Sequence, residues 1–161
     1  MKTILVGVDF TPESARVVET ALSLAAASKA RIVFLHVVSP INAAFDYGFC
    51  DPGVFRSEKE ISDTRTRLEE LANDATQAGI NAISEVLEGY KPYVILQRAR
   101  AHKVDLIVLG QHAHKVFHDL FGASVSQTIS RSCEFPVLLV PITSVEEEEV
   151  SEKISQSENY I

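Results

Sequence analysis

The stretch VDLIVLGQHAHKVFHDLFGASVS, residues 104–126, gives the clearest indication of the fold class. Its first seven residues form a short apolar run rich in β-branched side chains, which is typical of a strand buried on both faces of a sheet. A polar segment follows, and residues 124–133 then have the pattern of a helix. In parallel α/β sheets, ligands and phosphates bind where a strand is connected to the start of a helix. This stretch therefore predicts a parallel sheet with a site at the edge where its strands end.

The same alternation of apolar strand and amphipathic helix extends through the rest of the chain. We expect strands at 3–10, 30–38, 82–89, 104–110 and 135–141, and helices that begin near residues 12, 57, 91 and 124. The strand at 82–89 alternates apolar and polar residues, as an edge strand does. Five strands that alternate with four helices need crossover connections, so we expect one parallel sheet covered on both faces, a three-layer α/β sandwich. The first helix has one apolar face: Ala15, Val18, Ala21, Leu22 and Ala25.

Length and composition set limits on the class of protein. The chain has 161 residues, enough for one domain with a sizeable core. No apolar run reaches the roughly 20 residues of a membrane span, and the first apolar run is too short for a secretory signal. The two cysteines, Cys50 and Cys133, lie far apart and suggest neither a disulfide framework nor a structural zinc site. We therefore expect a cytoplasmic protein that does not bind membranes.

Charge is distributed unevenly along the chain. The net charge is −7, and residues 142–161 account for most of it, with six acidic residues and one lysine. The remaining body is nearly neutral and has no basic stripe, which argues against a nucleic-acid partner. We predict one domain over 1–141 and a solvated acidic tail over 142–161.

Three histidines and an aromatic loop are further candidates for function. His112, His114 and His118 have a spacing that can hold zinc or copper, but no cysteine lies near them and their segment has the pattern of a loop. We interpret them as solvated polar residues, and we predict no metal site. His36 lies inside an apolar strand and is interpreted as a core histidine. The loop at 39–56 carries four aromatic residues, and either a flap docked on the sheet edge or a lid over a cleft would explain them.

Four segments together resemble the universal stress protein family. They are ILVGVDFTPES at 4–14, LHVV at 35–38, VDLIVLGQH at 104–112 and SVSQTISRSCEFPVLLVP at 124–141. The resemblance spans residues 2–141 and implies a flavodoxin-like, Rossmann-like fold with strand order 3-2-1-4-5. It also implies a homodimer formed through the last strand, which here contains Val137, Leu138, Leu139 and Val140.

ATP-binding members of that family carry a glycine-rich loop, which this chain matches only in part. The three glycine positions fall on Gly110, Ala113 and Ala123, and Gly122 lies one place early. Glycine serves such loops by adopting positive φ and by letting backbone N–H groups approach phosphate closely. Alanine at positive φ costs about 1 kcal/mol, and its methyl group obstructs close approach. The resemblance therefore implies a degenerate nucleotide-binding loop.

Other parts of the family's nucleotide site are retained. By resemblance, Asp9 would contact the adenosine part of a nucleotide, and Val37 or Val38 would contact adenine. The helix start at Ser124, Val125 and Ser126 would hold an anion through its free N–H groups and dipole. From the residues alone, Asp9 is equally well explained as a turn acid beside Thr11, and the two serines as helix caps.

No catalytic constellation is present in the sequence. It lacks a nucleophile elbow, an H-E-x-x-H motif and a Walker A loop, so we expect a binding protein rather than an enzyme. The preferred hypothesis is a homodimeric stress-response interaction module with protein partners and no required cofactor. The alternative is a sensor that binds ATP or AMP, with weak ATPase activity.

Overall fold

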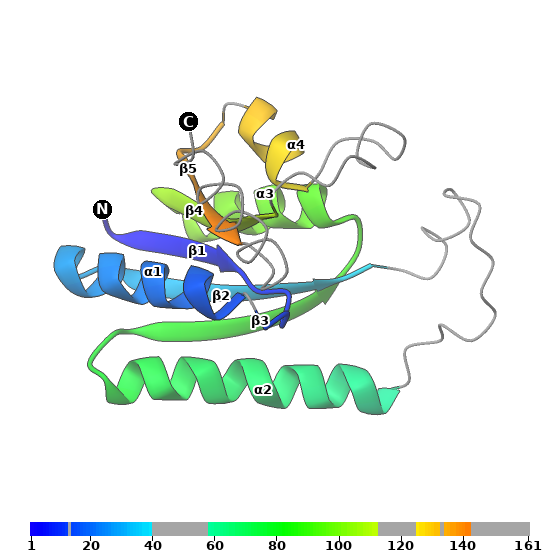
Figure 1. Cartoon of the computed structure of the whole chain (residues 1–161), viewed down its shortest axis with the longest axis horizontal. Coiled ribbons are helices and arrows are strands. Elements are labelled where there is room, and N and C mark those ends of the chain that lie inside the picture. Colours follow the sequence, from blue (N-terminus) through cyan, green and yellow to red (C-terminus); the bar gives the residue numbers. More distant parts are fainter. Residues whose placement is uncertain (13, 40–57, 113–124, 133, 143–161) are drawn as a thin grey trace, which may run out of the picture.

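A computed structural model of the chain describes residues 1–12, 14–39, 58–112, 125–132 and 134–142. Five parallel strands form one sheet in the order β3-β2-β1-β4-β5, as Figure 1 shows. They are β1 (Thr3–Gly7), β2 (Arg31–Val38), β3 (Ala82–Glu88), β4 (Leu106–His112) and β5 (Val137–Ile142). The predicted parallel sheet and its strand order are both confirmed.

Four helices in the described ranges cover the two faces of the sheet. They are α1 (Ser14–Ser28), α2 (Glu58–Gln77), α3 (Lys91–His102) and α4 (Val125–Ser132). One buried cluster joins the sheet to α1 and α2, and a second joins its other face to α3 and α4. The molecule is therefore the three-layer sandwich that the alternating sequence pattern predicts.

The central strands are apolar on both faces because both faces are covered. In β1, Ile4 and Val6 belong to the cluster under α1 and α2, whereas Leu5 between them belongs to the other cluster. In β2, Phe34 and Leu35 are divided in the same way. This alternation follows from the two-residue period of a strand and explains why the sequence shows continuous apolar runs.

The two outer strands differ from the central ones. β3 pairs only with β2 among the described residues, and its side chains are partly exposed, including Ile83 at 38 %. β5 pairs with β4 and lies at the opposite edge. The edge character predicted for residues 82–89 is thus confirmed.

The strand order reverses at the centre of the sheet. From β1 the chain proceeds outward through β2 to β3, and it returns to pair β4 with the other side of β1. Ligands of open α/β sheets bind beside such a reversal, outside the carboxyl ends of the strands. The topology therefore predicts a ligand site at the carboxyl ends of β1 and β4.

Several predicted features fall outside the described residues. These are most of the aromatic loop at 39–56, the loop residues Ala113, His114, His118, Gly122, Ala123 and Ser124, and the tail beyond residue 142. In the part of the chain that the structure describes, no helix has the length and apolar character needed to cross a membrane.

Candidate functional site

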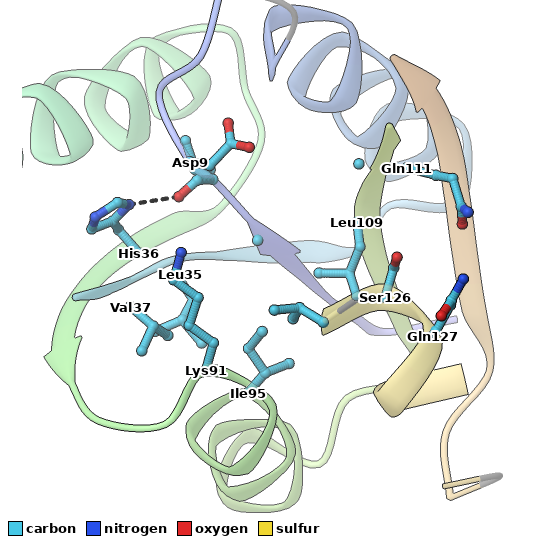
Figure 2. A pocket seen from close by; sticks show the side chains of 14 residues that line it. Asp9, Leu35, His36, Val37, Lys91, Ile95, Leu109, Gln111, Ser126 and Gln127 are labelled. Atoms are coloured by element: carbon cyan, nitrogen blue, oxygen red, sulfur yellow. Dashed lines mark hydrogen bonds between the residues drawn. The ribbon is translucent and has the colours of Figure 1, made fainter. Parts of the chain in front are cut away.

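A pocket of about 240 Å³ opens at the carboxyl edge of the sheet, beside the reversal of strand order. Figure 2 shows its lining side chains. The strands contribute Gly7–Asp9, Leu35–Val37 and Leu109–Gln111, and the helices contribute Lys91 and Ile95 from α3 and Val125–Gln127 from α4. Residues from five separate segments thus meet at one place, although they are distant in the sequence.

The structure brings together half of the residues that the sequence identified as a nucleotide site. The five that line the pocket are Asp9, Val37, Gly110, Val125 and Ser126. Val38 is buried but does not line the pocket. The other four, Ala113, Gly122, Ala123 and Ser124, lie outside the described residues.

The two ends of the pocket differ in chemistry. Figure 2 shows Asp9 and Val37 at one end, and Gln111, Ser126 and Gln127 at the other. Leu109 and Ile95, which are both buried, form an apolar floor between the two ends. Small-molecule sites usually combine an apolar floor with a few polar groups placed above it. An elongated ligand with an apolar ring and polar groups at both ends fits it.

The Asp9 carboxylate belongs both to a turn and to the pocket. Its Oδ1 atom accepts hydrogen bonds from the backbone N–H of Thr11 at 3.1 Å and from the Thr11 hydroxyl at 2.9 Å. These bonds form the Asx-type turn that ends β1 and fix the direction of the side chain. Because Asp9 also lines the pocket, the turn interpretation and the site interpretation are compatible.

The turn that carries Asp9 is held by His36, which also lines the pocket, and by Phe10. His36 is 7 % exposed, and its Nδ1 atom lies 2.7 Å from the Val8 carbonyl oxygen. Phe10 has a φ of 61°, which is rare for a bulky residue, and its ring packs against the His36 ring at 5.3 Å. The Arg67 guanidinium lies over the Phe10 ring, 4.4 Å from its centroid. The prediction that His36 is a core residue is confirmed.

Gly110 has a packing role that the sequence analysis missed. A Cβ atom at this position would come within 2.9 Å of Ile142 Cδ1 and 3.3 Å of Val17 Cγ2. Its φ is not in the left-handed region. A larger residue at 110 would therefore displace the side chains of Ile142 and Val17, so the packing of α1 and β5 on β4 favours glycine here whether or not a phosphate binds.

Several lining residues were not predicted from the sequence. Lys91 begins α3, Gln111 follows Gly110, and Gln127 lies in the first turn of α4. Each stands at the carboxyl edge of a parallel sheet, where strand ends and helix starts converge. That rule could have identified them once the strand order was known.

No metal centre is formed by the described residues. No group of three or more His, Cys, Asp or Glu side chains lies together there. Residue His112 ends β4, whereas His114 and His118 lie outside the described part of the chain. The absence of a metal site at these histidines stays a prediction.

The comparisons with known proteins agree on one family. The model of the universal stress protein family matches residues 1–141. Universal stress protein A of Escherichia coli strain K12 is 33 % identical over 150 residues, covering 91 % of this chain and 98 % of that protein.

Two solved structures extend the comparison. A universal stress protein in complex with cAMP has a TM-score of 0.60 and 24 % identity, over 87 % of this chain and 96 % of that one. The universal stress protein from Archaeoglobus fulgidus in complex with dAMP has a TM-score of 0.60 and 18 % identity, over 86 % of this chain and 97 % of that one. At these identities, the two structures show that the fold is shared.

Proposed function

The chain belongs to the universal stress protein family, and we propose that it binds an adenine mononucleotide in the pocket between Asp9 and Ser126. The protein then acts as a binding and interaction module, without turnover. The observation that carries the proposal is the meeting of Asp9, Val37 and the start of α4 around one apolar floor. The solved relatives in complex with cAMP and dAMP support a ligand of this class.

The chemistry of the pocket favours one orientation of the nucleotide. A carboxylate accepts hydrogen bonds from ribose hydroxyls, so Asp9 holds the ribose and Val37 packs against the base. The phosphate then lies at the opposite end, where the N-terminal turn of α4 presents backbone N–H groups and a positive dipole end. Lys91 at the start of α3 also lines the pocket and supplies a positive charge that suits an anionic ligand.

Two observations favour a short phosphate chain. The pocket volume of about 240 Å³ lies below the roughly 300–1,000 Å³ of typical ligand sites, which supports a small ligand. Alanine replaces glycine at 113 and 123, the positions where ATP-binding members let backbone approach the phosphates. AMP needs fewer of those contacts than ATP.

Calorimetry with AMP and ATP tests the proposal. We expect the wild-type protein to bind AMP more tightly than ATP. The double substitution Ala113→Gly with Ala123→Gly should strengthen ATP binding about tenfold to a hundredfold, and AMP binding less. Failure of both proteins to bind either nucleotide would refute the nucleotide site. Equal wild-type affinities for AMP and ATP would refute the preference for a short phosphate chain.

A second candidate function is protein interaction through the last strand. β5 lies at an edge of the sheet, and Val137, Leu138 and Leu139 are only partly buried. An apolar edge strand tends to be covered by pairing with another chain. This supports a homodimer formed through β5, which we place in the cytoplasm because the two distant cysteines suggest no disulfide framework.

A further inference from the structure

A second cleft lies on the face of the sheet opposite the nucleotide pocket, between α1 and α2. Its volume is about 470 Å³, within the roughly 300–1,000 Å³ of small-molecule sites. Both helices begin at the carboxyl edge of the sheet and run in the same direction, as Figure 1 shows. The cleft follows the segment from Thr11 to Glu19, which includes the start of α1, and about two turns of α2 from Arg67 to Asp74.

The floor of this α1–α2 cleft is apolar. Phe10, Val18 and Leu71 are partly buried and line it, above the buried Val8. Phe10 already has one cation on its ring, the Arg67 guanidinium at 4.4 Å.

The rim of the cleft is acidic. Glu19 comes from α1, and Glu70 and Asp74, one turn apart, come from α2. All three are exposed, and no ion pair engages them within the described part of the chain. With Arg67 the only basic residue in the described lining, three carboxylates face one guanidinium. The cleft therefore complements a ligand that is apolar in the middle and positively charged at its sides.

We propose that the α1–α2 cleft docks a basic amphipathic helix of a partner protein. An amphipathic helix places its apolar side chains in such a groove while its flanking lysines or arginines meet the rim. Charge argues against two other occupants of the cleft, the chain's own tail and a second copy of the chain. The chain's own tail has six acidic residues and one lysine, and a second copy carries a net charge of −7. This inference is independent of the nucleotide pocket.

A pair of charge-reversal variants makes the test specific. Glu70→Lys with Asp74→Lys alters the rim, whereas Asp63→Lys with Glu69→Lys changes the net charge equally on exposed positions of α2 that do not line the cleft. The probe is a synthetic amphipathic helix of leucine and lysine, titrated into the full chain. We expect the rim variant to weaken binding about tenfold and the control variant to leave it within about twofold.

Nuclear magnetic resonance of the same titration locates the probe. Backbone amide signals of residues 8–19 and 67–74 should shift, and those of α3 and α4 should not. Equal loss in both variants, or equal binding of a peptide with serine in place of leucine, would show nonspecific attraction and overturn the proposal. Absence of peptide binding would overturn the proposal as well. Binding of phenethylamine as tight as that of the peptide would also overturn it and would indicate a site for a small organic amine.

Discussion

The Nδ1 atom of His36 lies 2.7 Å from the carbonyl oxygen of Val8, so a side chain of β2 fixes the residue that follows β1. A carbonyl oxygen only accepts, and Nδ1 therefore carries the proton. The neighbouring backbone bond from the Val8 N–H to the Leu35 oxygen, at 2.9 Å, extends the pairing of the two strands. Together these bonds fix the backbone immediately before Asp9.

Removal of the His36 side chain should therefore lower the stability of the fold. We expect His36→Ala to lower the free energy of unfolding by about 2–3 kcal/mol, because the Val8 carbonyl loses its partner and the ring leaves a cavity. His36→Asn keeps a donor close to the Nδ1 position and should be less destabilised by about 1 kcal/mol. Urea unfolding measures both variants. Equal destabilisation would show that packing alone matters at this position.

Phe10 provides a test of backbone strain. Glycine normally destabilises a protein relative to alanine, but a φ of 61° reverses the preference. Both Phe10→Gly and Phe10→Ala lose the ring contacts with His36 and Arg67, so the two variants differ mainly in strain. We expect the glycine variant to be the more stable by about 1 kcal/mol in thermal or urea unfolding. The opposite order would mean that the turn relaxes to negative φ once the ring is gone.

The sequence predicted the sheet more accurately than the helix faces. Continuous apolar runs identify buried strands directly in the sequence. Crossover connections between those strands then allow only a few strand orders. The apolar face assigned to α1 was partly wrong, since Ala15 is exposed at the cleft and Val17 is buried instead. Helix α1 is apolar over more than one face, so spacing alone does not decide which residues meet the sheet.

The candidate site was predictable only where a residue follows a strand or starts a helix in a known motif. Asp9 and Ser126 met that condition, and both line the pocket. Lys91 did not meet that condition. It begins α3, which follows the edge strand β3, and the position of that strand is set by tertiary pairing. The packing reason for Gly110 was also hidden, since it involves Ile142 and Val17, which are distant in sequence.

Two glycines should separate ligand binding from stability. A Cβ at Gly7 would lie 2.6 Å from Leu109 Cδ2, and Leu109 lines the pocket, so Gly7→Ala must displace it. We expect AMP binding to weaken about tenfold. Gly79, with a φ of 85° and open space around it, is the control. Gly79→Ala should lower the unfolding free energy by about 1 kcal/mol and leave AMP binding unchanged. Unaltered AMP affinity in Gly7→Ala would argue against this pocket.

The ion cluster between β3 and α3 predicts a pH dependence. Partial burial acts to raise the pKa of the Glu85 carboxyl, but hydrogen bonds from Arg98 and His102 outweigh it and lower that pKa. A lowered folded-state pKa stabilises the fold above the unfolded value of about 4.3, and this stability is lost as pH falls through the folded value. Glu85→Gln should therefore cost about 1–2 kcal/mol at neutral pH and progressively less in acid.

A matched variant separates this cluster from ordinary surface charge. Glu134 forms a similar bidentate pair with Arg100, but both side chains are exposed. Exposed pairs are weak and are screened by salt. We expect Glu134→Gln to change stability little, and its effect to vanish in high salt while that of Glu85→Gln persists. A constant difference between wild type and Glu85→Gln from neutral to acidic pH would contradict the assignment.

The proposed dimer can be tested at the two edges of the sheet. Leu138 in β5 is partly buried, and a lysine there would place a charge in the apolar edge that we expect to pair with a second chain. Leu138→Lys should therefore sediment as a monomer.

Val140 is unsuitable because it is only 5 % exposed and belongs to the core, so a lysine there would disrupt folding. Ile83→Lys, on the opposite edge strand β3, is the control and should remain dimeric. A folded Leu138→Lys protein that sediments as a dimer would exclude β5 as the interface, and dissociation of Ile83→Lys would place the interface at β3.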